Sequence, residues 1–213
     1  MNNDKLAMLE RAILDMDKDL AYSLAKELVK DFPDVLHVVE ESLVKAMREV
    51  ADSYDRKEIF LPQVLATVNA FYSALRALHP SDGAGPSGRH LVLIGVVEGD
   101  MHDIGKNLVK VMLDANGFSC LDMGRNVPTD QFVDSIARKE PKYVALSTLM
   151  STTMVGMQEV LQGMAVSGLR AGRLVMVGGG PVNRGYAECI GADFYGKEAR
   201  DAVGWVRERE GAR

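Results

Sequence analysis

Residues 99–107 carry the strongest chemical signal in the chain, because they place a histidine between two carboxylates, Asp100 and Asp103, in a predicted loop. The apolar run 91–97 comes before them and is rich in Val and Ile, which is typical of a buried strand in a parallel sheet. Apolar residues at helical spacing come after them. In open α/β sheets, ligands bind at such strand-to-helix loops. His102 is the one histidine of the four that is predicted to lie in a loop of this kind.

The residue types of this loop suit transition-metal ligation. A neutral imidazole nitrogen is a good metal ligand, and Asp100 is placed to accept the other ring N–H. A single protein ligand does not hold a bare metal tightly, since zinc sites use three or four ligands. The pattern therefore favours a metal already enclosed in a macrocycle, with His102 as one axial ligand. Two simpler interpretations stay open: His102 only hydrogen-bonds within the loop, or Asp100 caps the next helix, although Asp103 is the better cap.

Two further segments follow predicted strands. Residues 147–153 contain five hydroxyl side chains in seven positions, which suits the lining of a narrow slot. Residues 178–180 are all glycine, and glycines directly after a strand allow a ligand to approach the backbone closely. A hydroxyl-rich helix start and a tight strand-to-helix connection are the alternatives for the two segments. No Gly-Lys-Ser or Gly-Lys-Thr follows the glycines, so they are not a phosphate loop.

The elements that position these segments alternate between strand and helix. Strands are predicted at 91–97, 119–122, 143–147, 174–177 and 193–195, and helices at 106–115, 130–138, 155–166, 186–190 and 200–209. This alternation predicts an α/β domain with a doubly wound, flavodoxin-like (Rossmann-like) sheet of five parallel strands. Its switch point would lie between the first and third strands, so all three segments would meet at the carboxyl edge of one sheet.

The residues before this domain predict a different architecture. Apolar residues at helical spacing, separated by short loops, indicate a four-helix bundle over residues 1–80, with Pro33 opening the third helix. Residues 81–88 are almost entirely Gly, Pro and Ser and are predicted to be a linker. The predicted domains are therefore a helical cap domain at 1–80 and an α/β domain at 89–213.

Composition limits the function classes. The chain has 213 residues, 47% of them hydrophobic and 26% charged, which is ordinary for a globular protein. Residues 1–88 carry 10 Lys and Arg against 15 Asp and Glu, and residues 89–213 carry 15 of each, so neither part is basic and nucleic acid is not an expected partner. No apolar run approaches membrane-spanning length and the N-terminus resembles neither a signal nor a transit peptide, so we expect a cytoplasmic protein. Cys120 and Cys189 are predicted to be free, buried thiols.

The motif Asp100-x-His102-x-x-Gly105 resembles the signature of cobalamin-binding domains that hold the corrinoid with its own base detached. The longer form GDMHDIGKN is similar to corrinoid proteins of methyltransferase systems and to the cobalamin module of methionine synthase. The resemblance implies a base-off/His-on corrinoid with His102 as the lower axial ligand of cobalt. It also implies that Asp100 relays a proton to and from His102 and that the hydroxyl of Thr153 completes the relay.

Further cofactor contacts follow from the same resemblance. In the α/β domain they are Gly99, Met101, Asp103, Ile104, Gly105, Ser147, Leu149, Ser151, Gly178, Gly179, Gly180 and Ala199. In the helical domain, which resembles a cap over the upper cobalt face, they are Glu40, Tyr54, Leu61 and Val64. This chain departs from the family at two positions, with Gly180 where alanine is usual and Tyr54 where phenylalanine is frequent. Ordinary bundle core is the alternative for Leu61 and Val64.

The function implied by the resemblance is that of a methyl carrier, with methylcobalamin as one form of the cofactor. Its partners would be a substrate-specific methyltransferase, an acceptor methyltransferase on the tetrahydrofolate or thiol side, and a corrinoid reductive activase. The chain is too short to hold the donor and acceptor active sites as well, so it would not be a complete enzyme alone. A cobalamin-dependent sensor and the small subunit of an adenosylcobalamin mutase are the alternatives, and the methyl donor stays open.

Overall fold

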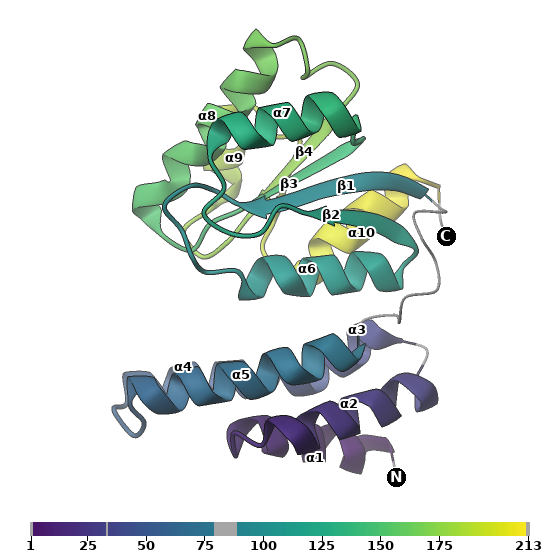
Figure 1. The fold of residues 1–213 in the computed structure, drawn as a ribbon, viewed down its shortest axis with the longest axis vertical. Helices are drawn as coiled ribbons and strands as arrows, with labels where there is room; N and C mark the ends of the chain where they lie inside the picture. Colours follow the sequence, from purple (N-terminus) through teal and green to yellow (C-terminus); the bar gives the residue numbers. More distant parts are fainter. Residues whose placement is uncertain (1, 33, 79–88, 212–213) are drawn as a thin grey trace. The chain divides into compact units, whose positions relative to one another are not determined.

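The computed structural model describes residues 2–32, 34–78 and 89–211. The chain divides into two compact units, Met1–Gly83 and Ala84–Arg213, and each is described here by itself. Figure 1 shows the helical unit in purple and blue and the α/β unit in teal to yellow. Pro33 and the predicted linker, residues 81–88, lie outside the described residues, so their roles stay predictions.

The helical unit consists of four helical rods, as the sequence predicted. They are α1 (Asn2–Leu14), α2 (Lys18–Asp31), a third rod made of α3 (Val35–Val38), η1 (Val39–Val44) and α4 (Lys45–Asp55), and α5 (Leu61–Leu78). Asp17 and Asp34 begin the second and third rods, because their carboxylates accept N–H groups of the first turn. Leu28, Leu43 and Phe71 are among the fully buried side chains at the centre of the unit.

The middle of the third rod is a π-helix, which the helical spacing of its apolar residues did not reveal. Over Val39–Val44 the backbone is wound more widely than in the α-helical turns on both sides. The buried Ser42 hydroxyl donates to the carbonyl of Val38 inside this segment. Such π segments are frequent at functional sites, and this one contains Glu40, a predicted cofactor contact.

The α/β unit follows the predicted alternation closely. Its strands are β1 (Arg89–Val96), β2 (Phe118–Asp122), β3 (Tyr143–Ser147), β4 (Leu174–Gly178) and β5 (Phe194–Gly196). Its helices are α6 (Ile104–Ala115), α7 (Thr129–Lys139), the short 3-10 helix η2 (Ser151–Thr153), α8 (Met154–Val166), α9 (Arg184–Ile190) and α10 (Ala199–Arg209). Each predicted strand and helix of this domain overlaps an observed one.

The sheet is parallel throughout and has the strand order β2-β1-β3-β4-β5. The switch point lies between β1 and β3, as predicted. Val96 pairs with Ser147, and Ser147 pairs with Gly178, so β1, β3 and β4 end at the same level. In Figure 1, α6 and α10 cover one face of the sheet, and α7, α8 and α9 cover the other. The three predicted ligand segments therefore leave the sheet at one edge.

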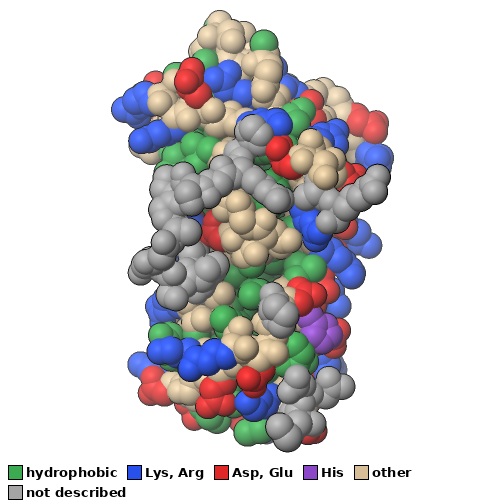
Figure 2. All heavy atoms as spheres, turned by 90° about the vertical axis from the view of Figure 1, so that its right-hand side faces the viewer, with side chains coloured by type: hydrophobic (Ala, Val, Ile, Leu, Met, Phe, Trp, Pro, Cys, Tyr) green, Lys and Arg blue, Asp and Glu red, His purple; other side chains and the backbone are tan. Residues whose placement is uncertain are grey.

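Three surface features bear on the sequence analysis. Both cysteines are free, but Cys189 is exposed on the short helix α9, so the prediction that both are buried is wrong for this residue. Basic and acidic side chains are interspersed on the face shown in Figure 2. Within the described ranges, no helix has the length and apolar character needed to cross a membrane.

Candidate functional site

The loop between β1 and α6 brings His102 to the carboxyl edge of the sheet. Gly99 has a φ of 82°, in the left-handed region that glycine adopts without strain. Asp100 follows and is fully buried. Asp103 occupies the N-cap position of α6, as expected, so the alternative in which Asp100 caps the helix is wrong. The buried aspartate is therefore available for other partners.

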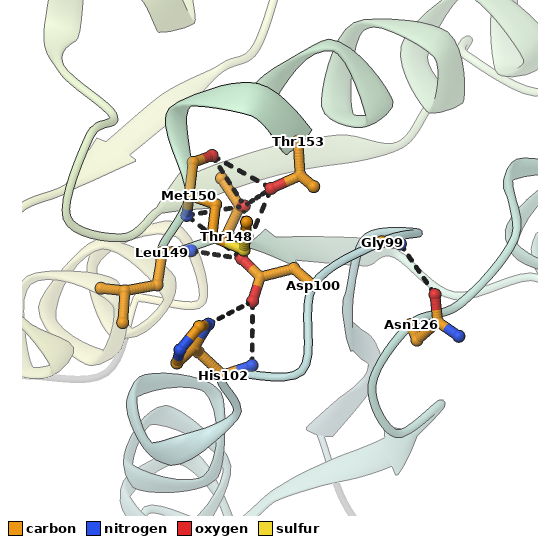
Figure 3. Close-up of polar contacts among 8 residues, drawn as sticks. All are labelled: Gly99, Asp100, His102, Asn126, Thr148, Leu149, Met150 and Thr153. Atoms are coloured by element: carbon orange, nitrogen blue, oxygen red, sulfur yellow. Dashed lines mark hydrogen bonds and ion pairs between the residues drawn. The ribbon is translucent and has the colours of Figure 1, made fainter.

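Asp100 links the β1 loop to the loop after β3 (Figure 3). Its Oδ1 accepts the main-chain N–H of His102 at 2.9 Å and lies 2.7 Å from Nδ1 of the same residue. Its Oδ2 accepts the Thr148 hydroxyl at 2.7 Å and the N–H of Leu149 at 2.6 Å. The N–H of Met150 is a weaker third donor at 3.2 Å. One carboxylate thus orients the histidine ring and anchors the neighbouring loop.

The surroundings of Asp100 keep it ionised. Burial alone would raise the pKa of this carboxyl, because a charged group loses solvation. Hydrogen bonds from the Thr148 hydroxyl and from the N–H groups of His102 and Leu149 outweigh that effect and hold the pKa of Asp100 well below the usual aspartate range. Asp100 therefore presents a lasting negative charge to Nδ1 of His102.

Thr148, which no sequence motif singles out, supplies the hydroxyl closest to Asp100. Its Oγ1 lies 2.7 Å from the Asp100 carboxylate and 2.6 Å from Oγ1 of Thr153, and its side chain is buried. Thr153, the predicted relay hydroxyl, is 3.5 Å from the same carboxylate. The observed chain of contacts therefore runs from His102 through Asp100 to Thr148 and then to Thr153. Only the density of hydroxyls in residues 147–153 pointed to this region.

The His102 ring is half in contact with solvent. Its side chain is 54% exposed, although the aspartate beside it is fully buried. Because Nδ1 faces Asp100, a proton on Nδ1 leaves the lone pair on Nε2, at the other side of the ring. In that tautomer Nε2 is the ring nitrogen that can bind a ligand.

Close packing requires a glycine at position 179 and leaves little space at positions 178 and 180. Gly179 has a φ of 127°, and a Cβ at this position would lie 1.7 Å from the carbonyl oxygen of Thr148. At Gly178 a Cβ would lie 3.0 Å from the carbonyl oxygen of Gly196, and at Gly180 it would lie 3.0 Å from a methyl group of Leu149. The β4 segment therefore packs directly against the loop that carries Thr148.

The start of α6 and the tips of the two loops that Asp100 joins are open to solvent. Gly105 lies in the first turn of α6, and no described atom is within 4 Å of a Cβ built there. Met101 and Leu149 are exposed hydrophobic side chains in the two loops that Asp100 joins. An open glycine and exposed apolar side chains in these segments suit a large, partly apolar ligand.

The remaining predicted contacts of the α/β unit are spread along the same edge or near it. Ser147 ends β3 and Ser151 begins η2. Ile104 begins α6, and Ala199 begins α10 directly after the β5 exit. Ser151 is exposed, whereas the other three are half-buried. Unlike Asp100, these four residues have no described hydrogen bond to His102, so their roles stay predictions.

The predicted contacts of the helical unit differ in exposure. Tyr54 and Leu61 are exposed, and Val64 and Glu40 are half-buried. The interpretation of Leu61 as bundle core is therefore wrong, because its side chain does not enter the core of its own unit. Tyr54 lies in the last turn of α4, and Leu61 is the first residue of α5. Their exposure leaves both side chains available to a ligand or partner.

Comparisons with known proteins agree with this geometry. A family described as "B12 binding domain" matches residues 90–204, and a second family with the same description matches residues 6–79. The trimethylamine corrinoid protein of Methanosarcina barkeri is 38% identical over 205 residues, covering 95% of this chain and 94% of that protein. The chain belongs to the B12-binding corrinoid proteins.

Two solved structures support the assignment to this corrinoid protein family. The monomethylamine corrinoid protein of Methanosarcina barkeri matches with a TM-score of 0.84 and 31% identity, covering 98% of this chain and 99% of that one. A chain of the methanol:cobalamin methyltransferase complex of the same organism matches with a TM-score of 0.57 and 28% identity, covering 99% and 81%. The likeness to these corrinoid proteins extends over both units.

The residues of the site fit the corrinoid that the family binds. A corrinoid holds its cobalt in a ring of nitrogens, so the protein needs to supply only one axial donor. Nε2 of His102 could serve as such a donor, and Oδ1 of Asp100, 2.7 Å from Nδ1, would favour the tautomer that ligation requires. The open side of Gly105 and the hydroxyls of residues 147–153 leave polar, uncrowded surroundings for a large ligand.

Proposed function

We propose that this chain is a corrinoid-binding methyl carrier that moves a methyl group between a substrate-specific methyltransferase and an acceptor methyltransferase. The family supports corrinoid binding, and the names of the relatives support the methyltransferase context. The observation that carries the proposal is the hydrogen-bonded chain His102–Asp100–Thr148 at the switch point of the sheet. When bound, the corrinoid supplies a cobalt centre that accepts and releases a methyl group.

We further propose that the corrinoid is bound base-off/His-on, with Nε2 of His102 as its lower ligand. The support is the position of Asp100, which accepts at Nδ1 and so directs the lone pair of the ring to Nε2. A relay proton on Nδ1 would face the Asp100 carboxylate, whose pKa is held well below the usual aspartate range. Thr148 and Thr153 extend the hydrogen-bonded chain away from the histidine.

The other predicted residues have supporting roles in this proposal. Ser147, Leu149, Ser151 and the glycines 178–180 would line the slot for the displaced nucleotide tail. Tyr54, Leu61, Val64 and Glu40 would contact the corrinoid from the helical unit and exclude water from it. The exposure of Tyr54 and Leu61 supports this role, since apolar side chains left uncovered in their own unit favour a further contact.

We propose methylated amines as the donor class and a thiol- or tetrahydrofolate-linked methyltransferase as the acceptor side. The relatives that support the donor class are named as trimethylamine, dimethylamine and monomethylamine corrinoid proteins. A reductive activase would restore the corrinoid after oxidation. The weaker match to a methanol complex chain makes methanol the competing donor.

Reconstitution followed by methyl transfer tests the proposal. Purified protein is loaded with a corrinoid and mixed with methyltransferases specific for trimethylamine, dimethylamine, monomethylamine or methanol. We expect stoichiometric corrinoid absorbance and methyl uptake with one of the amine enzymes, and loss of histidine ligation in His102→Ala. A loaded protein that accepts no methyl group from any of them would favour the sensor or mutase alternatives. Failure to bind any corrinoid would refute the proposal.

A further inference from the structure

Lys106 is a buried charged residue for which the proposed function has no role. It lies in the first turn of α6, four residues after His102, and its side chain is 2% exposed. Lysine is almost never buried to this degree unless its charge is paired. Its Nζ lies 2.6 Å from both carboxylate oxygens of Asp122, the last residue of β2. A lysine and an aspartate thus join the helix after the His102 loop to the end of the neighbouring strand.

Residues 122–126, which we call the β2-exit segment, also contact the start of the His102 loop. The N–H of Gly99 donates to Oδ1 of Asn126 at 2.7 Å (Figure 3), and the N–H of Asn126 donates to the carbonyl of Asp100 at 2.9 Å. Asn126 has a φ of 53°, a left-handed conformation that asparagine tolerates better than most residues. The segment therefore contacts the loop on both sides of His102.

Internal bonds fix the β2-exit segment itself. The N–H of Gly124 donates to Oδ1 of Asp122 at 2.8 Å, which orients the carboxylate toward Lys106. The carbonyl of Gly124 accepts the N–H of Val96 at 3.0 Å, at the end of β1. The segment is thus anchored to β1, to the start of the His102 loop and to the first turn of α6. A segment anchored at these points can hold the His102 loop in a fixed position relative to the sheet.

Lys106 is buried and Asp122 is 29% exposed, and an ion pair of this kind is a weak source of stability and a better source of defined geometry. Replacing such a pair with apolar side chains often leaves stability unchanged, because desolvation offsets the attraction between the charges. The core-facing positions later in the same helix are apolar, namely Val111, Met112 and Leu113. A lysine in place of an apolar residue therefore indicates a positional role for Lys106.

We propose that Lys106, Asp122 and Asn126 are positioning residues that fix the direction in which His102 presents Nε2. Lys106 and Asp122 hold the end of the loop, and Asn126 holds its start. This inference rests on the proposed function for its ligand, but the holding of the loop is a property of the protein alone. It can therefore be tested with and without a corrinoid.

Amide hydrogen exchange in the corrinoid-free protein is the first test. In Lys106→Met we expect the amides of Gly99 and Asn126 to exchange about tenfold faster, which corresponds to the loss of about one hydrogen bond. In Asn126→Gly only the Gly99 amide should respond, and Asn126→Asp should restore its protection because it keeps the acceptor oxygen. Lys110→Met is the matched control, since it removes a lysine of the same helix that pairs with Asp114. Protection of Gly99 that is equal in all variants would overturn the proposal.

The corrinoid-loaded protein gives the second readout. Spin resonance of the cobalt(II) form reports the fraction of molecules with histidine nitrogen bound. We expect this fraction to fall in Lys106→Met and Asn126→Gly and to match the wild type in Asn126→Asp and Lys110→Met. If the wild type binds no corrinoid, the proposed function fails while the exchange data still decide whether the segment holds the loop. If the wild type is His-on and both loosened variants are equally His-on, the positioning role is refuted.

Discussion

The His102 loop has two unlike neighbours, residues 147–153 on the β3 side and the β2-exit segment on the β2 side. On the β3 side the contacts are buried and charge-assisted, with the Thr148 hydroxyl and the N–H of Leu149 donating to one carboxylate. On the β2 side Gly99 and Asn126 are exposed, and in the Lys106–Asp122 pair only the lysine is deeply buried. The difference indicates that the β3 side fixes the charge of the site, whereas the β2 side fixes its direction and leaves room for a ligand.

Substitution of one glycine on each side should give the largest difference in stability between the two sides. In Gly179→Ala the new Cβ would overlap the Thr148 carbonyl, so the β3 side has to move, and we expect the free energy of unfolding to fall by more than ~3 kcal/mol. Gly124 also has a positive φ, 86°, but a Cβ there meets no described atom within 4 Å. Gly124→Ala should therefore cost only about 1 kcal/mol. Urea unfolding of the two corrinoid-free variants measures both values, and equal losses would contradict the difference between the sides.

Asp100→Asn removes the charge that organises the β3 side. The amide can accept only at one atom, so its NH2 group would face either the donors of the β3 loop or those of His102. We expect a loss of about 2–3 kcal/mol in the free energy of unfolding, because hydrogen bonds to a charged group are replaced by a mismatch. Chemical denaturation at neutral pH measures the loss, and a change within experimental error would show that the carboxylate is not needed as a charge.

The pH dependence of the stability difference between wild type and Asp100→Asn isolates the effect of ionising Asp100. The pKa of Asp100 is lower in the folded protein than in the unfolded chain, so its ionisation stabilises the folded state at pH values above the unfolded pKa, about 3.9. That contribution is lost progressively as the pH falls below this value toward the folded pKa. We therefore expect the stability difference between wild type and Asp100→Asn to shrink on acidification below pH ~4. A difference that grew on acidification would give the opposite sign for the shift.

Thr148→Val and Thr153→Val compare the hydroxyl that contacts Asp100 most closely with the hydroxyl that the sequence predicted. Thr148→Val leaves Oδ2 of Asp100 without its hydroxyl donor and should cost about 1–2 kcal/mol of unfolding free energy, which Thr148→Ser should largely restore. Thr153→Val should cost less than about 1 kcal/mol, because Thr153 lies farther from the carboxylate and also bonds the carbonyl of Met150. Thermal or urea unfolding of the three variants ranks them, and a larger effect at Thr153 would reverse the order.

Gly105→Ala should have the smallest effect on stability and the opposite sign. Alanine favours helix over glycine by roughly 0.5–1 kcal/mol, and the position has space, so the corrinoid-free protein should gain stability. The added methyl group should still weaken corrinoid binding, because it fills part of the open side near His102. Unfolding and corrinoid titration measure the two effects, and unchanged corrinoid affinity would remove Gly105 from the site.

The fold could be predicted from the sequence because its signals are local. Apolar runs and helical spacing located every strand and α-helix described in the α/β unit, but not the short 3-10 helix η2, and the strand order placed the His102 loop at the switch point. The π segment was missed because a π turn keeps the apolar spacing of its neighbours over so few residues. The cysteine prediction was wrong for Cys189 because residue type, rather than the exposure of α9, was the basis for it.

The site could be predicted only where residue type and closeness in the sequence together indicate a contact. His102 and Asp100 are two residues apart in one loop, so their contact follows from the sequence. The choice between Thr148 and Thr153 depends on how the chain turns after β3, and neighbouring hydroxyls carry no signal for that. Lys106 would be expected at the surface by its type, and its pairing with Asp122 depends on contacts between α6 and β2.

The most direct test of the account is the spin resonance spectrum of the cobalt(II) form of the reconstituted protein, with 15N introduced into its histidines. We expect nitrogen hyperfine splitting that changes with the label and disappears in His102→Ala. A splitting that ignores the label, or that persists in the variant because the corrinoid keeps its own base on cobalt, would contradict the claim that His102 binds the metal.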